Sequence, residues 1–190
     1  MTEEESAFFD GRLLIAMPGA TDSRFDRSVI YMCAHSADGA MGVIVNKPAH
    51  ELKFSDLLEQ LEIAPSPGMR DLQVHFGGPV DRVRGFILHG ADYRSEESTL
   101  DVNEHFAMTG TRDILRAIAD GGGPKEALLV LGYAGWGPGQ LEGEIRAHAW
   151  LVADADPELV FETEDEEKWD RAVGGLGIDP AQLSGAGGRA

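Results

Sequence analysis

The sequence predicts one domain that mixes helices and strands, an α/β domain of the α+β type. Short apolar runs of strand length, bounded by glycine and proline, alternate with segments whose apolar residues recur at helical spacing. The chain has 190 residues, of which 43% are hydrophobic, and this is enough for one sizeable core. The sequence contains neither an internal repeat nor a linker between two cores. A single domain is therefore expected over residues 1–190, with residues 1–6 and 185–190 as flexible ends.

Strands are expected first near the N-terminus, where three apolar runs follow one another closely. They are residues 13–17, which stop at Pro18, residues 29–34, and residues 41–46, which stop before Pro48. Short connections favour antiparallel neighbours, so these three strands are expected to pair in that way. Further strands are expected at residues 74–80, broken by a turn, and at residues 84–89, 127–131 and 150–153.

Helical spacing first appears in the apolar residues from Leu52 to Leu61, with Ser55 as the expected N-cap and Pro65 beyond the end. A second helix is expected to begin after Thr111, which can cap it, and to end at the glycine-rich residues 121–123. The remaining helices are expected around Leu141 and Ile145, and at residues 157–161 and 166–173.

The charge of the chain argues against two classes of partner. It has 33 acidic and 16 basic residues and a net charge of −17, so phosphate backbones and anionic lipid surfaces repel it at long range. No basic helix or helix-turn-helix pattern is present. Neither nucleic acid nor a membrane is therefore expected as a direct partner.

The single cysteine, Cys33, excludes a disulfide within the chain and fits a reducing compartment. It lies in an expected core strand, where a buried, unreactive thiol is favoured over a nucleophile. The first six residues are acidic, unlike the basic start of a secretory signal, and no apolar stretch approaches the ~20 residues that span a bilayer. A cytoplasmic protein is expected.

The most distinctive segment is the glycine-rich stretch 132–139, which holds Trp136 and directly follows the apolar run 127–131. It is predicted to be a loop that leaves the sheet and enters a short helix. Its glycines let the backbone approach a ligand or another segment closely, and its tryptophan can line a pocket or plug the core. Burial of the Trp136 ring in the core is favoured over a place in the lining of a pocket. Because the loop lacks Lys, Arg, Ser and Cys, it brings neither a phosphate-binding cation nor a nucleophile.

Five motifs run in a fixed order through nearly the whole chain. They are residues 11–18 (GRLLIAMP), Asp22 and Phe25 with residues 27–30 (RSVI), residues 42–48 (GVIVNKP), residues 76–80 (FGGPV), and residues 132–136 (GYAGW) with 139–142 (GQLE), Glu144 and Ile145 before Trp150. In this combination the chain closely resembles the bacterial YqgE/AlgH family. The resemblance implies a compact α/β domain whose bent mixed sheet forms a partial barrel with flanking helices. The activity of that family is not settled, some members carry a transcriptional-regulator label from genetic association with alginate production, and no agreed catalytic residues exist to be transferred.

Polar candidates for a binding site lie first between the first two expected strands. Asp22, Arg24, Asp26 and Arg27 could form a bidentate site for a carboxylate or phosphate, although an internal ion-pair cluster is favoured. Asn46 follows a buried strand, where its side chain is expected to bond local backbone in a turn.

Two further candidate groups lie in the glycine motifs. Gly78 could bring backbone amides together as an anion nest, but the stretch lacks a phosphate-binding fingerprint and a tight turn is favoured. Glu142 and Glu144, beside Gln140, are the best acid-base candidates. Because they are two residues apart, they face different sides of a helix and do not share a proton. A carboxylate near a helix N-terminus also interacts favourably with the helix dipole, and this structural role is favoured over catalysis.

No metal or cofactor is expected. None of the six histidines stand at a spacing typical of metal ligands on a helix, and His75 and His89, which could meet across a sheet, are interpreted as structural. The acidic run from Asp154 to Asp170, relieved only by Lys168, lacks the pattern of a calcium loop. It is interpreted as a solvated face that could favour a basic partner.

The sequence favours a non-catalytic protein that binds a small molecule or a protein partner, and it assigns no catalytic residue. The expected binding residues are Asp22, Arg24, Arg27, Asn46, Gly78, Trp136, Gln140 and Glu142. One alternative is a hydrolase-type or isomerase-type enzyme that uses Glu142 or a histidine together with Arg24 or Arg27. The other is a transcriptional regulator, as in the family label. Strand-end loops of one sheet gather at one edge, so Asp22, Arg27, Asn46, Trp136 and Gln140 are expected to cluster.

Overall fold

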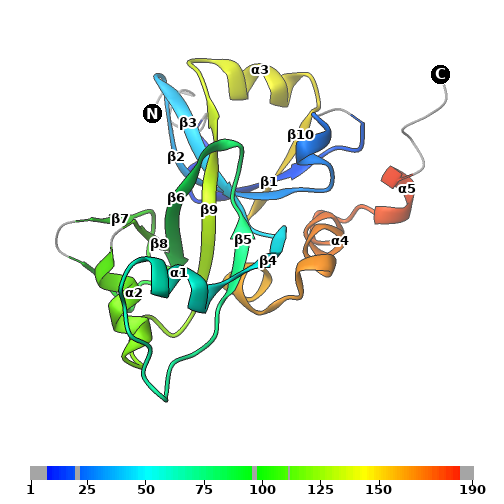
Figure 1. Cartoon of the computed structure of the whole chain (residues 1–190). Helices are drawn as coiled ribbons and strands as arrows, with labels where there is room; N and C mark the ends of the chain where they lie inside the picture. The colour runs from blue at the N-terminus through cyan, green and yellow to red at the C-terminus, as the bar shows by residue number, and fades with distance from the viewer. Residues whose placement is uncertain (1–7, 20–21, 96–97, 111, 185–190) are drawn as a thin grey trace.

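The structure is a computed structural model that describes residues 8–19, 22–95, 98–110 and 112–184. In these residues, ten strands form a curled sheet with the order β10-β1-β2-β3-β9-β6-β8-β7, to which β5 and then β4 attach beside β9. Helices flank the sheet, and the sheet bends into a partial barrel (Figure 1). The predicted α+β fold with a bent sheet is confirmed. The two predicted flexible ends and the Thr111 cap lie outside the described residues.

Antiparallel strands form one half of the sheet: β1 (Arg12–Ala16), β2 (Val29–Ser36), β3 (Gly39–Ile44) and β10 (Trp150–Asp154). The antiparallel pairing predicted for the first three strands is confirmed. Side chains of β2 alternate between two apolar clusters, because successive residues of a strand face opposite sides of the sheet. Both faces of this half are therefore covered, which explains why these strands read as continuous apolar runs.

The other half contains the long strand β6 (Val80–His89) and four strands of three to six residues: β4 (Pro48–Lys53), β5 (Gln73–Phe76), β7 (Thr99–Asp101) and β8 (Ala107–Thr109). β5 runs parallel to β9 and antiparallel to β4, so the sheet is mixed, as expected. β4, β7 and β8 were not predicted. The last two have only three residues each, and β4 is mostly exposed and polar, so neither length nor periodicity marks them.

One strand, β9 (Ala127–Trp136), belongs to both halves. Its first part pairs with β5 and β6, and its last part, Ala134–Trp136, pairs with β3. The prediction that residues 132–136 form a loop is therefore wrong. The chain stays in the sheet as far as Trp136, and only residues 137–139 form the turn into the next helix.

The glycines of the two glycine motifs interlock where β9 crosses between the halves. Gly132 has φ of 77°, and a Cβ placed on it would lie 2.4 Å from the Gly78 oxygen. A Cβ on Gly77 would lie 2.3 Å from the Gly132 oxygen, and one on Gly78 would lie 2.1 Å from the Tyr133 carbonyl carbon. Such distances leave no room for any side chain. Gly77 fastens the crossing, because its amide donates to Leu131 O and its oxygen accepts from the Ile44 amide, each at 2.8 Å.

The helices cover the sheet from several sides (Figure 1). They are α1 (Phe54–Gln60), α2 (Arg112–Ala119), α3 (Gln140–Arg146), α4 (Asp165–Gly175), α5 (Pro180–Ser184), the 3-10 turn η2 (Ser23–Phe25) and the π-helical turn η3 (Glu158–Glu162). The predicted start of the first helix is wrong, because Leu52 belongs to β4, which runs directly into α1. The N-cap is Lys53 and makes no side-chain capping bond, so Ser55 lies within the helix.

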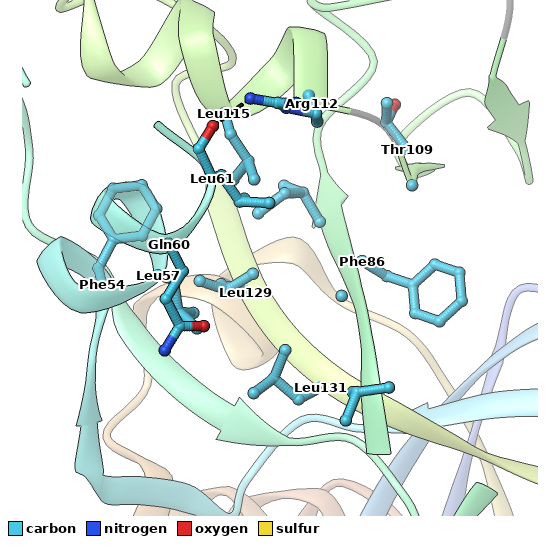
Figure 2. Close-up of a pocket in the computed structure, with 14 residues that line it drawn as sticks. Phe54, Leu57, Gln60, Leu61, Phe86, Thr109, Arg112, Leu115, Leu129 and Leu131 are labelled. Atoms are coloured by element: carbon cyan, nitrogen blue, oxygen red, sulfur yellow. Dashed lines mark hydrogen bonds between the residues drawn. The ribbon is translucent and has the colours of Figure 1, made fainter. Parts of the chain in front are cut away.

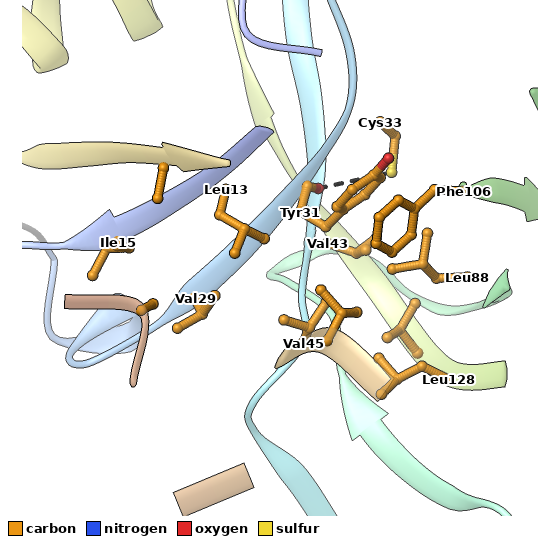
Figure 3. Close-up of a cluster of buried hydrophobic side chains, with 14 of the residues drawn as sticks. Leu13, Ile15, Val29, Tyr31, Cys33, Val43, Val45, Leu88, Phe106 and Leu128 are labelled. Carbon is orange, nitrogen blue, oxygen red and sulfur yellow. Dashed lines mark hydrogen bonds between the residues drawn. The ribbon is translucent and has the colours of Figure 1, made fainter. Parts of the chain in front are cut away.

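The largest apolar cluster lies between the sheet and α4. Tyr31, Phe106 and Trp169 are fully or almost fully buried in it, with the Tyr31 and Phe106 rings 4.6 Å apart (Figure 3). Cys33 lies in the same cluster, and burial raises the pKa of its thiol to about 12. The interpretation of Cys33 as a buried thiol is therefore confirmed, and its lack of reactivity stays a prediction.

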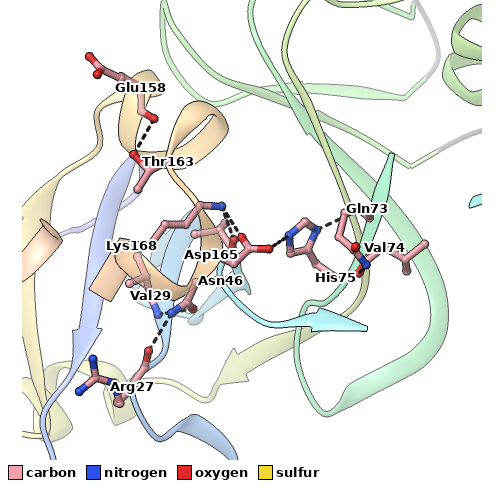
Figure 4. Close-up of polar contacts among 11 residues, drawn as sticks. Arg27, Val29, Asn46, Gln73, Val74, His75, Glu158, Thr163, Asp165 and Lys168 are labelled. Carbon is pink, nitrogen blue, oxygen red and sulfur yellow. Dashed lines mark hydrogen bonds and ion pairs between the residues drawn. The ribbon is translucent and has the colours of Figure 1, made fainter. Parts of the chain in front are cut away.

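A buried polar cluster fastens α4 to the sheet. Lys168 Nζ donates to Val45 O at 2.7 Å and to Asp165 Oδ1 at 2.8 Å, and Asp165 Oδ2 lies 2.8 Å from His75 Nε2 (Figure 4). The side chains of Lys168 and His75 are only 2% and 5% exposed. The interpretation of this acidic run as a wholly solvated face is therefore wrong at Asp165 and Lys168. Their charges are paired in the interior, as buried charges must be.

Replacing Gly132 with alanine is expected to destabilise the fold. The left-handed backbone costs a residue with a Cβ about 1–2 kcal/mol, and the collision with Gly78 O adds roughly 1–3 kcal/mol. Gly143→Ala is the matched control, because this α3 glycine has nothing within 4 Å of its ideal Cβ and the change is expected to be neutral or stabilising. Urea unfolding of both variants measures the difference. Equal unfolding midpoints would contradict the interlock.

Replacing Asp165 with asparagine is expected to cost about 3–5 kcal/mol at pH 7, because it leaves the buried Lys168 ammonium without its counter-charge. Burial raises the pKa of Asp165, but hydrogen bonds from His75 and Lys168 outweigh it, so this pKa lies below its ordinary value. A carboxylate whose pKa is lowered by folding stabilises the fold fully at pH values above its unfolded-state pKa. This stabilisation is lost as the pH falls through the folded-state pKa.

The difference in unfolding free energy between wild type and Asp165→Asn should therefore become smaller as the pH falls below about 4. Denaturant unfolding at several pH values measures it. The control is Glu166→Gln, a change at an exposed acid of the same helical turn, which should shift stability by less than about 0.5 kcal/mol. A gap that is absent or independent of pH would show that the cluster does not hold α4.

Candidate functional site

The candidate site forms where β9 ends and α3 begins. Gly139 takes a left-handed conformation with φ of 73° just before Gln140, which lets the chain turn sharply from the strand into the helix. The Gln140 side chain accepts a hydrogen bond from the Gly137 amide at 3.0 Å and so closes the turn. This turn brings the first residues of α3 back over the Trp136 ring.

Glu144 is the centre of the site. Its Oε2 accepts the indole N–H groups of Trp136 and Trp150, each at 2.8 Å, and its Oε1 accepts the Gln140 amide at 3.1 Å. The two indole rings meet edge to face, with centroids 6.0 Å apart. One carboxylate therefore fixes two tryptophans from different strands, Trp136 on β9 and Trp150 on β10.

A hollow of about 340 Å³ opens in front of this group. Its lining residues come from η2, the start of β6, β9, α3 and β10: Asp22, Arg24, Phe25, Pro79, Val80, Gly135, Trp136, Gln140, Glu144, Ala149 and Trp150. We call it the tryptophan pocket. Trp136 and Trp150 are only 7% and 4% exposed, so they form a rigid wall rather than mobile flaps. The volume falls within the range typical of small-molecule sites.

Asp22 and Arg24 form the polar rim of the tryptophan pocket. Asp22 caps η2 by accepting the Arg24 amide at 2.9 Å, and its carboxylate also binds the Arg24 Nε and Nη2 atoms at 2.9–3.2 Å. The side-chain hydrogen bond from Arg24 lowers the pKa of Asp22 and raises that of Arg24. The structure thus brings together four of the predicted binding residues: Asp22, Arg24, Trp136 and Gln140.

Arg27 and Asn46 lie elsewhere and have other partners. Arg27 Nη2 binds Asp170 at 2.9 Å, and its guanidinium stacks over Trp169 of α4 at 4.3 Å. Asn46 accepts the Val29 amide and donates to Arg27 O, each at 2.8 Å (Figure 4). Asn46 therefore ties the β3–β4 connection to the start of β2, and neither residue lines the tryptophan pocket.

Glu142 and Gly78, the other two predicted binding residues, do not line the tryptophan pocket. Glu142 points to the other side of α3, as expected for residues two apart, and lies 2.5 Å from Nε2 of the buried His35. Since His35 Nδ1 accepts the Phe9 amide at 2.9 Å, Nε2 carries the proton and donates to Glu142. A backbone amide bond and then His35 hold the pKa of Glu142 below its ordinary value. Gly78 packs against the Tyr133 backbone behind Pro79.

Glu142 does not converge with Arg24 or Arg27, the arginines expected to act beside it in an enzyme. Glu142 pairs with His35, Glu144 with the two indoles, and Arg27 with Asp170. His75 and His89 do not pair with each other, because His75 contacts Asp165 while His89 contacts Thr109 Oγ1 at 2.8 Å and Gly90 O at 2.7 Å. Among the described residues, no helix is both long and apolar enough to cross a membrane.

Sequence reasoning missed the role of Glu144. Trp136 and Trp150 stand eight residues before and six residues after Glu144 in the chain, a spacing that belongs to no single helix or strand. The one signal in the sequence for this role is that an acid shares a motif with two tryptophans. Each indole N–H needs a hydrogen-bond acceptor when the ring is buried, and a nearby carboxylate can serve both.

Replacing Trp136 with alanine is expected to destabilise the protein by roughly 3–5 kcal/mol, because it empties a buried site. Trp136→Phe keeps most of the apolar contact but removes one indole donor to a charged acceptor, so it should cost less, about 1.5–3 kcal/mol. Thermal and urea unfolding measure both variants beside wild type. An alanine variant with an unchanged midpoint would refute the packing role of this ring.

Comparison with known proteins places the chain in a family. Residues 13–181 match the model of the family DUF179, described as AlgH-like. A UPF0301 protein of Cereibacter sphaeroides is 53% identical over 95% of this chain and 98% of its own length, and one of Rhodospirillum rubrum is 48% identical over 100% and 98%. The solution structure of the AlgH protein from Pseudomonas aeruginosa matches with a TM-score of 0.79 at 38% identity, covering 100% of both chains.

A crystal structure of a protein from Corynebacterium diphtheriae shares the fold, with a TM-score of 0.64 at 22% identity over 86% of this chain and 84% of that one. The matches cover the glycine motifs, the tryptophan pocket and α4 together, because the family model spans residues 13–181. The chain therefore belongs to the AlgH-like family of bacterial proteins.

Proposed function

We propose that this protein is a non-catalytic binding protein of the bacterial cytoplasm, and that its ligand occupies the tryptophan pocket. The observation that supports this proposal is that Glu144, the central carboxylate of the pocket, is already engaged in three hydrogen bonds. Two indoles and one amide already bind its two oxygens. A carboxylate held in this way sets the shape of the pocket and is poorly suited to take or give a proton.

The lining of the tryptophan pocket indicates the chemistry of the ligand. Phe25, Trp136 and Trp150 supply aromatic surface, with Phe25 and Trp150 edge to face at 5.8 Å. Arg24 stands at the rim. Asp22 accepts hydrogen bonds from its Nε and Nη2 atoms, and within the part of the chain that the structure describes no hydrogen bond uses Nη1. An aromatic or otherwise flat molecule that carries an anionic group satisfies both features, since Arg binds carboxylates and sulfonates through its outward N–H groups.

A regulatory role of the kind suggested by the family label would then operate through this ligand or through a protein partner rather than through direct reading of DNA. The net charge of −17 opposes the phosphate contacts on which such reading depends. A hydrolase or isomerase reaction finds less support, because its candidate groups are separately paired.

The probe that tests the proposal is 8-anilinonaphthalene-1-sulfonate, which combines an aromatic body with one anion. We expect saturable binding to the folded protein, followed by the fluorescence of the probe and by quenching of the tryptophans. Arg24→Glu should weaken it about tenfold, because the charge at the rim is reversed.

Arg146→Glu, which reverses an exposed charge on α3 outside the lining, is the control and should leave the affinity unchanged. Thermal unfolding of each variant establishes that the probe meets folded protein. Equal affinities for wild type and Arg24→Glu would remove the tryptophan pocket as the ligand site.

A further inference from the structure

A second surface, on the other half of the sheet, has the features of a docking site for an extended peptide. It is the segment Asp81–Arg84 of β6, which we call the open edge. In the pairing with β9, Val80 lies opposite Tyr133 and the next pair is Gly85 with Leu131. Four residues of β6 therefore stand against the single residue Gly132, so the open edge bulges out of the ladder. Asp81 marks the bulge with φ of 49°.

Among the described residues, no strand pairs with the open edge on its other side. β8 pairs only with Ile87–His89 of β6, and it ends at Thr109, after which α2 begins at Arg112 and leaves the sheet. Val83 lies in the middle of the open edge, and 93% of its surface is exposed, far more than any other large apolar residue described. A strand edge with free backbone groups and an exposed apolar side chain is a template for strand addition.

Two apolar hollows flank the open edge, and they share Phe86 and Gly110 as lining residues. The first, of about 220 Å³, lies under α1 and α2 and is lined by Leu57, Leu61, Val83, Leu115, Leu129 and Leu131, among others (Figure 2). We call it the leucine hollow. The second, of about 470 Å³, is lined by Met41, Arg84, Leu100, Met108 and Tyr133, among others, and we call it the methionine hollow.

The hollows lie on opposite faces of the sheet. Leu129 and Leu131 belong to the apolar cluster under α1 and α2, whereas Phe86, Met108 and Tyr133 belong to the cluster on the other face. Figure 2 shows the Phe86 ring directed away from Leu129 across β6. Successive side chains of a strand point to opposite faces, so two consecutive apolar residues of an added strand would enter one hollow each.

The charges around the open edge indicate the composition of the partner. The described lining of the two hollows contains two arginines, Arg112 and Arg84, and no carboxylate, in a chain with 33 acidic residues. Arg82 adds a third exposed cation on the open edge, whose one carboxylate is Asp81 at the bulge. Such charges and a bulge discourage indiscriminate edge pairing. A second copy is a poor occupant, because antiparallel pairing centred on Val83 would set Arg82 opposite Arg84.

From this geometry we propose that the open edge binds an extended segment of a partner protein, in which two adjacent apolar residues are flanked by acidic residues. The backbone of the segment pairs with β6 in line with β8, its apolar side chains fill the leucine and methionine hollows, and its carboxylates meet Arg84 and Arg112. This surface is separate from the tryptophan pocket and does not depend on the function proposed for it.

The test uses the peptide acetyl-Thr-Glu-Val-Leu-Glu-Thr-amide as probe and amide spectra of the ¹⁵N-labelled full chain as readout. We expect shifts centred on the amides of residues 81–86 and Gly110, and new protection from hydrogen exchange within the open edge. A peptide with lysine in place of both glutamates, and the variant Arg84→Glu with the original peptide, should each bind about tenfold more weakly. Arg146→Glu, remote from both hollows, should bind like wild type.

Three results would overturn the proposal. The first is the absence of shifts at the open edge at millimolar peptide, and the second is equal binding of the glutamate and lysine peptides. The third is self-association of the protein alone that Val83→Lys abolishes in sedimentation experiments, which would make a second copy the occupant. Because Val83 and Arg84 are exposed, both variants should unfold at the wild-type temperature, and this measurement verifies that lost binding is not lost folding.

Discussion

The close crossing of β9 past the Gly77–Gly78 backbone is the constraint on which the rest of the structure depends. Three glycines meet at distances that exclude a Cβ, and the left-handed Gly132 redirects β9 from one half of the sheet to the other. The amino-terminal part of β9 thus joins the half covered by α1 and α2, while its end carries Trp136 to β3 and α3. The same crossing leaves Gly132 facing four residues of β6, so the bulge of the open edge and the position of the tryptophan pocket have one origin.

Partly buried carboxylates fasten the helices α3 and α4 to this frame in a similar manner. Glu144 of α3 ties Trp136 to Trp150, and Asp165 of α4 ties His75 to Lys168. In each case a carboxylate on a helix accepts a hydrogen bond from at least one neighbouring strand, and partial burial strengthens those hydrogen bonds while making their loss costly. The family's glycine, tryptophan and acidic motif positions therefore have structural reasons in this chain. A ligand would meet a preformed surface, which lowers the entropic cost of binding.

The spacing of apolar residues, together with the positions of glycine and proline, is sufficient to predict the mixed fold, the first antiparallel strands, the short helix α3 and strand β10. They failed at residues 132–136, since a run rich in glycine looks like a loop, whereas here each glycine permits a close approach within a strand. The sequence predicts Asp165 and Lys168 as surface residues, because the position of a charged residue in the sequence does not show whether its side chain is buried. For the site, the sequence predicts Asp22, Arg24, Trp136 and Gln140 as binding residues, because each lies next to the end of a predicted strand. The direction of Arg27 toward α4 depends on a contact between residues far apart in the chain. The two indoles on Glu144 come from different strands, at spacings that match no single helix or strand.

Native-state hydrogen exchange at the crossing tests this account most directly. The Gly77 amide donates to Leu131 O of β9, and the Ile44 amide of β3 donates to Gly77 O. The first bond therefore breaks only if the glycine turn separates from β9, and the second only if the turn separates from β3. If the crossing holds the two halves together, both amides should exchange with the free energy of global unfolding, like the Ala16 amide that joins β1 to Ser28 O. Exchange of Gly77 and Ile44 through a local opening, well below the free energy shown by Ala16, would contradict the account.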